Sequence, residues 1–138
     1  MTRSNYIRHI IAGALVLALL AACASTDTLM AARGKGVKRT FRYGYDDVYA
    51  VALEAAGKRK LQIVDVTTSK DTILLANGAS WSSLGERVAV FIIQLNDKTT
   101  SVEIVSRPLV PTVTFPPDWA GLLFGDIEEL LAVRRLSR

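Results

Sequence analysis

The first 22 residues join a positively charged start to an uninterrupted apolar run. Arg3 and Arg8 supply the charge, and no acidic residue accompanies them. From Ile10 to Ala22 the chain is apolar throughout, apart from the neutral Gly13. At 13 residues this run is shorter than the roughly 20 that a helix needs to cross a bilayer. The pattern is typical of a targeting segment that is cleaved off, which leaves residues 23–138 to fold.

The apolar run ends in Leu20-Ala21-Ala22-Cys23, and here the chain resembles bacterial prolipoproteins. Their lipobox is a Leu, two small residues and a Cys whose thiolate accepts a diacylglyceryl group. The resemblance implies that residues 1–22 are a signal peptide and that Cys23 carries the anchor, palmitate included. Several acyl chains hold a protein on a membrane, where one chain would not. The alternative is an ordinary signal peptide cleaved nearby, with Cys23 incidental.

The resemblance to prolipoproteins also implies a location. In Gram-negative lipoproteins an Asp after the acylated cysteine favours retention in the inner membrane, and this chain has Ala24 there. We therefore expect a protein anchored in the cell envelope at the outer membrane and facing the periplasm. Its first partner is then the membrane itself, through the lipid on Cys23.

The chain after the signal peptide lacks the side chains of most catalytic and metal sites. Its one His, His9, lies in the signal peptide, and its one Cys is the lipidated residue. A Ser-His-Asp or Cys-His site, a His/Cys metal site and an internal disulfide are therefore excluded. Residues 23–138 hold 15 basic and 13 acidic side chains, scattered along the chain, which does not favour nucleic-acid binding. We expect no enzyme, no cofactor, no metal and no nucleic-acid partner.

Residues 23–36 combine the lipidated Cys23 with small, polar and glycine residues and show no sustained periodicity. This composition predicts a flexible tether between lipid and domain. Five basic residues and no acidic one lie between Arg33 and Arg42. Such a run beside a membrane anchor can lie on anionic headgroups, and a solvated linker is the alternative.

Residues 37–138 predict a single α+β domain: an antiparallel sheet with two helices on one face, in the order β-α-β-β-β-β-α. The strands are expected at 37–43, 61–66, 72–76, 87–95 and 101–106. One helix is expected to start with Asp46 as N-cap and to end at Gly57, and a second to start with Asp118 as N-cap. The strand 87–95 is apolar on both faces, which predicts a central position in the sheet.

Two short segments carry a looser family resemblance. Tyr45-Asp46-Asp47-Val48 at a helix start and Gly85-Glu86-Arg87-Val88 at a strand start are similar to small envelope lipoproteins with a helix-grip or BamC-like module. The Pro-rich segment before the last helix departs from the helix-grip pattern. Because fold alone does not carry function, the resemblance implies an architecture and not an activity.

The best candidate for a partner-binding surface is the Pro-rich segment 107–119, together with an aromatic residue of the loop 79–85. Prolines lower the entropy that such a segment loses on binding, and aromatic side chains are favoured interface anchors. The alternative is that the same side chains are buried in the domain's own core. The candidate partner-binding residues are Trp81, Val110, Val113, Phe115 and Trp119.

Two functions fit these observations. The first, which the sequence favours, is a non-enzymatic accessory or structural role in an envelope assembly, with an envelope protein as possible partner. The second is a binding module that holds a small apolar ligand between helices and sheet. A sizeable cavity would favour the second, and its expected lining is Phe91, Ile93, Leu123 and Ile127.

Replacing Cys23→Ser removes the thiolate that accepts the lipid. We expect metabolic labelling with palmitate to disappear and the protein to leave the membrane fraction. The native chain, labelled in parallel, is the control. A Ser variant that still labels and still sediments with membranes would contradict the assignment of Cys23.

Overall fold

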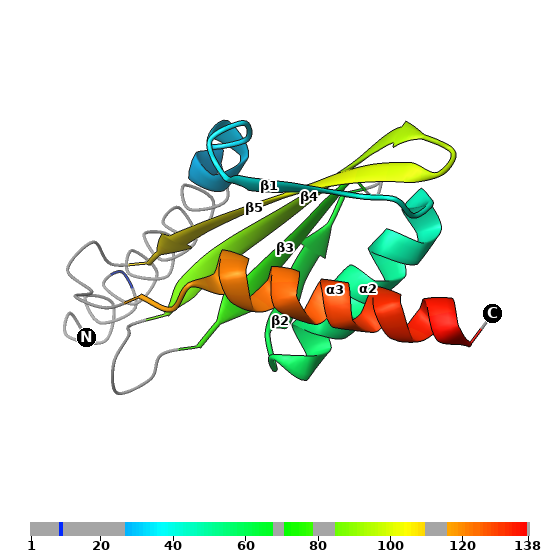
Figure 1. Ribbon diagram of the computed structural model, residues 1–138. Helices are drawn as coiled ribbons and strands as arrows, with labels where there is room; N and C mark the ends of the chain where they lie inside the picture. Colours follow the sequence, from blue (N-terminus) through cyan, green and yellow to red (C-terminus); the bar gives the residue numbers. More distant parts are fainter. Residues whose placement is uncertain (1–8, 10–26, 68–70, 79–84, 110–115, 138) are drawn as a thin grey trace.

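The computed structural model describes residues 9, 27–67, 71–78, 85–109 and 116–137. The expected order of elements is confirmed (Figure 1). The elements are β1 (Val37–Phe41), α2 (Tyr45–Lys58), β2 (Gln62–Val66), β3 (Thr72–Asn77), β4 (Glu86–Asn96), β5 (Thr99–Pro108) and α3 (Trp119–Leu136).

The strands form one antiparallel sheet in the order β1-β5-β4-β3-β2. The chain enters at one edge with β1, crosses through α2 to the other edge, and returns by β2, β3, β4 and β5. Val37 of β1 therefore lies opposite Ile104 of β5. β4 pairs on both sides, which confirms its predicted central position.

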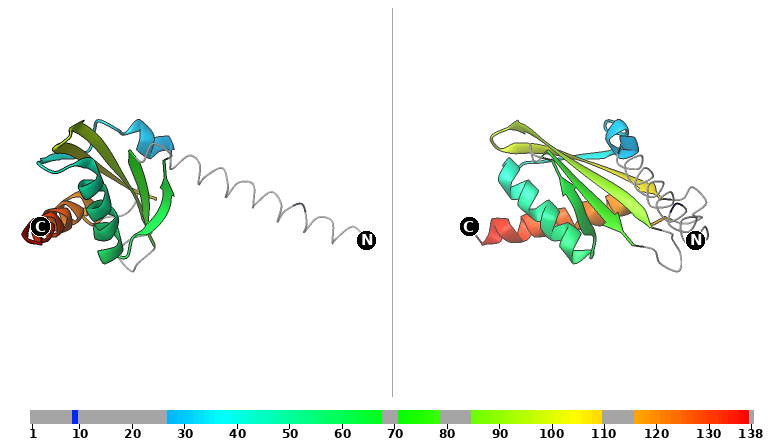
Figure 2. Two further views of the ribbon diagram at one scale, coloured as in Figure 1. Left: turned by 90° about the vertical axis from the view of Figure 1, so that its right-hand side faces the viewer. Right: turned by 180° about the vertical axis from the view of Figure 1, so that it is seen from behind.

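α2 and α3 cover the same face of the sheet, as predicted, and the main core lies between them (Figure 2). Val88, Val90 and Ile92 of β4 point into this core. Leu123 and Ile127 of α3 pack in the same core, and each is only 1% exposed. A side chain that lined a water-sized hole would expose surface to it, so the interface is filled by its own side chains.

The ends of α2 differ from the prediction. Gly44, not Asp46, is the N-cap, and Asp46 lies in the first turn, where the helix dipole favours an anion. Gly57 lies inside the helix, which continues to Lys58. The chain turns instead at Lys60, which takes a left-handed φ of 57° and donates its N–H to the carbonyl of Gly57.

α3 begins as predicted, because the carboxylate of Asp118 accepts the N–H of Gly121. Before it, β5 runs two residues past its predicted end, to Pro108. A proline is tolerated at the end of a strand, where its missing N–H is not needed by the ladder. No helix in the described ranges is both long and apolar enough to span a membrane.

A short helix at residues 27–31 covers the opposite face of the sheet, which we call the far face (Figure 2). Leu29 is only 1% exposed and packs in a cluster with Phe91 and Val105. The described part of the predicted tether, residues 27–36, is therefore packed on the domain. The reason is that β4 and β5 present apolar side chains on both faces, and the far face also has to be covered.

Ile127→Ala should cost about 2–5 kcal/mol of unfolding free energy, because it removes a fully buried side chain. Urea unfolding of residues 24–138 measures the change. Val133→Ala is the matched control: Val133 lies on the same helix but is 58% exposed, and its truncation should stay within about 0.5 kcal/mol. A similar small loss for Ile127→Ala would show that α3 packs on another face.

Candidate functional site

A hollow opens where the end of α3 meets the start of α2, and we call it the α3 hollow. Its volume is about 130 Å³. Three segments contribute to its wall: the loop between β1 and α2, the first turn of α2 and the last turns of α3. The lining residues are Tyr43, Asp47, Leu131, Arg134 and Arg135.

The spacing of residues along α3 builds one side of the hollow. Leu131 lies three and four positions before Arg134 and Arg135, so the three side chains share one helix face. Leu131 packs into the main core and gives the hollow an apolar floor, which the ring of Tyr43 extends. The two guanidinium groups lie at the rim. The cations also suit the C-terminal end of a helix, where the dipole is negative.

The two arginines differ in their pairing. Arg134 donates to a carboxylate oxygen of Glu54 on α2 at 3.3 Å. Arg135 makes no ion pair within the residues that the structure describes. The hollow therefore combines an apolar floor with the carboxylate of Asp47 and two arginines, of which Arg134 is paired and Arg135 has no ion pair in the described residues. The two guanidinium groups outnumber the one carboxylate of the lining. This arrangement suits a small apolar group with an anionic end.

A second, more open hollow of about 330 Å³ lies beside β4, lined by Arg33, Tyr45, Asp71, Ile92, Ile93 and Gln94. The charges on its wall pair with each other, since Arg33 lies 3.5 Å from Asp71. Burial, followed by the negative charges that Tyr49, Asp71 and Asp46 can carry, raises the pKa of Tyr45, so its phenol stays protonated at neutral pH. Because Arg33 is already paired with Asp71, the second hollow is a weaker candidate for binding an anion than the α3 hollow.

Asp126 of α3 clamps α3 to the C-terminal end of α2, whereas the α3 hollow lies at the start of α2. Its side chain is 3% exposed, and its two oxygens accept from the guanidinium of Arg59. The ammonium group of Lys58 lies 3.0 Å from the same carboxylate and 2.7 Å from that of Glu129. The hydrogen bonds from Arg59, opposed by burial and aided by Lys58, hold the pKa of Asp126 below its usual value.

Two further carboxylates are buried and hold parts of the fold. Glu103 on the far face accepts the N–H groups of Gly34 and Gly36, each at 2.7 Å. Glu86 accepts from the Asn77 amide at 2.7 Å and from the Trp119 indole at 3.4 Å. Over the described ranges, no group of three or more His, Cys, Asp or Glu side chains could hold a metal ion.

The structure places one of the predicted partner-binding residues, Trp119, in the main core at 7% exposure. It is therefore removed from the proposed binding surface, since its indole is packed and hydrogen-bonded at the start of α3. The other predicted residues, Trp81, Val110, Val113 and Phe115, lie outside the described residues, as does Cys23.

The cavity lining predicted for a ligand is wrong as a set. Leu123 and Ile127 face the helix side of the sheet, but Phe91 belongs to the far-face cluster. Alternate residues of a strand point to opposite faces, so Ile93 also turns away from the helices, where it is 41% exposed. The α3 hollow lies instead at the ends of the two helices. Leu131, Arg134 and Arg135 belong to the predicted second helix and Asp47 to the start of the first, but no sequence pattern brings them together.

Comparison with known proteins gives little beyond the backbone. No protein-family model matches the chain. No curated protein matches it either. Among solved structures, the chain is similar to a START superfamily protein from Mycobacterium smegmatis, with a TM-score of 0.39 and 11% sequence identity over 70% of this chain and 90% of that one. At this score and identity the likeness says nothing about the residues of the site.

Asp126→Asn should lower the unfolding free energy at pH 7 by about 1–3 kcal/mol, because it removes the charged acceptor of Arg59. A carboxyl whose pKa is depressed by folding stabilises above its unfolded pKa of about 3.9 and loses that effect as pH falls through the folded value. The unfolding free energy should therefore change less with pH, between neutral and acid, for the variant than for the native chain.

Glu128→Gln is the matched control for Asp126→Asn. Glu128 pairs with Arg39 at 2.6 Å, but both side chains are about half exposed, so the loss should stay below about 1 kcal/mol. Equal losses and equal pH slopes for the two variants would refute the clamp.

Proposed function

We propose that the chain is a lipid-anchored envelope lipoprotein whose domain acts as a binding module for a small ligand. The α3 hollow carries the binding part of this proposal. It is a preformed concave site with an apolar floor and a few polar groups, which is the usual form of a small-molecule site. The anchor rests on the lipobox at Leu20 to Cys23.

The size of the hollow limits the ligand. An apolar cavity of about 150 Å³ can hold a benzene-sized molecule, so 130 Å³ suits a short alkyl chain or one ring. Arg135 at the rim favours a carboxylate or phosphate at the other end of the ligand. The ligand class is therefore a small amphiphile with an anionic head. This proposal moves the ligand from the predicted place between helices and sheet to the ends of the two helices.

A binding role also agrees with the structural role of the buried carboxylates, which accept hydrogen bonds within the fold. Asp126 holds the guanidinium of Arg59, and Glu103 holds two backbone N–H groups. The hydrogen bonds from Arg59 lower the pKa of Asp126, which makes that carboxylate a poor proton donor near neutral pH. Binding without chemical conversion is accordingly the role that we assign to the domain.

A second candidate is the accessory role in an envelope assembly, and β2 favours it. This strand is an edge of the sheet, and its apolar Ile63 and Val64 are about half exposed. An unpaired edge with apolar side chains can accept a strand of another protein. An envelope protein that pairs with β2 would leave the α3 hollow open, so the two roles are separable.

Titration of residues 24–138 with hexanoate, followed by NMR, tests the binding role. Signals of Tyr43 and Leu131 should shift, with a dissociation constant in the millimolar range that is normal for a ligand of this size. Arg135→Glu should weaken hexanoate binding by about fivefold, because the headgroup loses its cation. The same variant should leave the binding of uncharged 1-hexanol unchanged.

Lys60→Glu is the control for this titration, since it reverses an exposed charge outside the lining of the hollow. It should leave both titrations as in the native chain. If neither compound shifts Tyr43 or Leu131 at saturation, the α3 hollow is not a ligand site and the accessory role through β2 becomes the leading proposal.

A further inference from the structure

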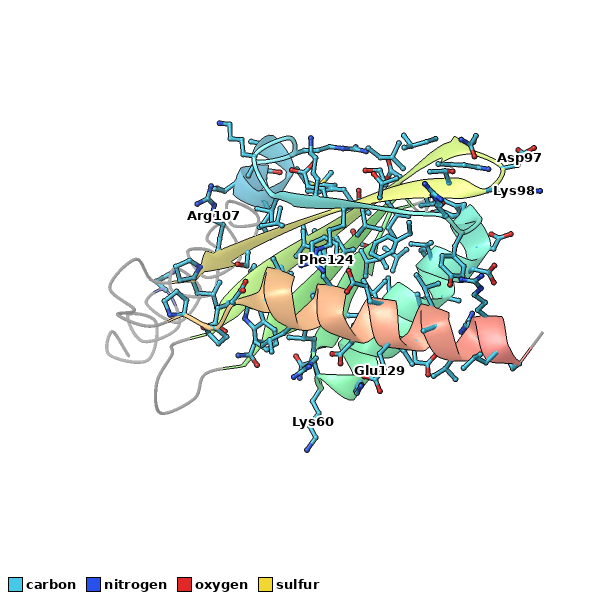
Figure 3. The ribbon with its side chains drawn as sticks, viewed as in Figure 1. Lys60, Asp97, Lys98, Arg107, Phe124 and Glu129 are labelled. Carbon is cyan, nitrogen blue, oxygen red and sulfur yellow. The ribbon has the colours of Figure 1, made fainter. Side chains whose placement is uncertain are left out.

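Two arginines face each other on the far face of the sheet. Arg87 of β4 is directly opposite Arg107 of β5 in the antiparallel register. Arg87 alternates with Ala89 and Arg107 with Val105, both members of the far-face cluster, so both side chains leave the sheet on that face. Figure 3 shows Arg107 on the side of the short helix and away from α3.

Like charges at directly opposed positions destabilise a sheet. Neither Arg87 nor Arg107 makes an ion pair with any residue that the structure describes. An anion bound between the two guanidinium groups would offset their repulsion. Arginine pairs of this kind suit phosphate, since each guanidinium presents a planar fork of donors.

Lysines of the adjoining segment extend the basic surface. Lys38 of β1 is opposite Glu103 and therefore lies on the same far face. Its ammonium group is 3.7 Å from Glu103, whose carboxylate is 3% exposed and already accepts two backbone N–H groups. Lys35 precedes β1 in the turn after the short helix and is exposed. We call Lys35, Lys38, Arg87 and Arg107 the basic face.

The distance to the anchor places this face near a bilayer. The short helix begins at residue 27, four residues after Cys23. Four extended residues span at most about 14 Å, so an acylated Cys23 keeps that helix close to the headgroups. Leu29 fixes the helix to the far face. The surface nearest the anchor is therefore the one that carries the basic face.

We infer that the far face docks on the bilayer, with the basic face on the phosphates of anionic lipids. The inference rests on the proposed anchor at Cys23 but not on the α3 hollow. It adds an orientation to that proposal: the sheet lies over the membrane, and α2, α3 and their hollow point away from it. A surface of this kind is attracted by anionic headgroups within about one Debye length, roughly 10 Å at ordinary salt.

Fluorescence quenching on vesicles tests the orientation. In the acylated chain the thiol of Cys23 is occupied, so one introduced cysteine can be labelled alone. Thr40→Cys puts a fluorophore on the far face, two residues along β1 from Lys38, and Val133→Cys puts one on the exposed side of α3. The chains are placed in phosphatidylcholine vesicles with and without phosphatidylglycerol, each with a headgroup-labelled nitroxide lipid.

We expect several-fold stronger quenching at position 40 than at position 133 on anionic vesicles, and a smaller difference on neutral ones. Arg87→Glu/Arg107→Glu should remove the gain from anionic lipid, as should high salt on the native chain. The matched double reversal Lys60→Glu/Lys98→Glu, at exposed positions away from the basic face, should keep it (Figure 3). The salt series needs no variant, so misfolding of one cannot imitate the result.

Each remaining outcome contradicts a defined part of the docking proposal. Chains that float with the vesicles but are quenched equally at both positions keep their anchor and overturn the orientation. Stronger quenching at position 40 that ignores lipid charge, salt and the Arg87→Glu/Arg107→Glu reversal overturns the role of the basic face. Chains that do not float with vesicles lack the anchor, which overturns both the proposed lipoprotein and the docking.

Discussion

The double-sided burial of β4 and β5 is the constraint from which the rest of the structure follows. Val88, Val90 and Ile92 need cover on one face, and Ala89 and Phe91 need it on the other. α2 and α3 supply the first layer, and no further long helix is present in the described ranges to supply the second. The cover comes from the short helix with Leu29, which packs the described N-terminal segment onto the fold.

The parts of this fold that depend on local patterns were predictable from the sequence. The apolar run of β4 indicated a central strand, and Asp118 indicated the start of α3. The end of α2 was missed because Gly57 looked like a C-terminal glycine, whereas Lys60 takes the left-handed position. The short helix was missed because Leu29 and Ala32 alone are too few to show a period, and their burial depends on distant strands.

The α3 hollow was not predictable for a related reason. Its wall joins Tyr43, Asp47 and Leu131, which lie far apart in the chain and meet only because α2 and α3 pack together. Ion pairs join the two helices along their length: Lys58 and Arg59 pair with Asp126, and Glu54 pairs with Arg134 further along α3. The two helices run antiparallel, so the start of α2 lies beside the end of α3. Residues at the ends of two separate helices thus line one hollow.

If Cys23 carries the proposed lipid anchor, the close passage at Gly36 has a mechanical consequence. A Cβ at Gly36 would lie 2.5 Å from the carbonyl oxygen of Ile104, so the chain is held against β5 before β1 begins. Tension applied from the anchor first meets Leu29 under the far face, and then the turn that Glu103 holds through two N–H groups. The edge strand β1 lies behind both attachments. Pulling on the lipid would therefore load buried packing and a buried carboxylate before it could peel the first strand from the sheet.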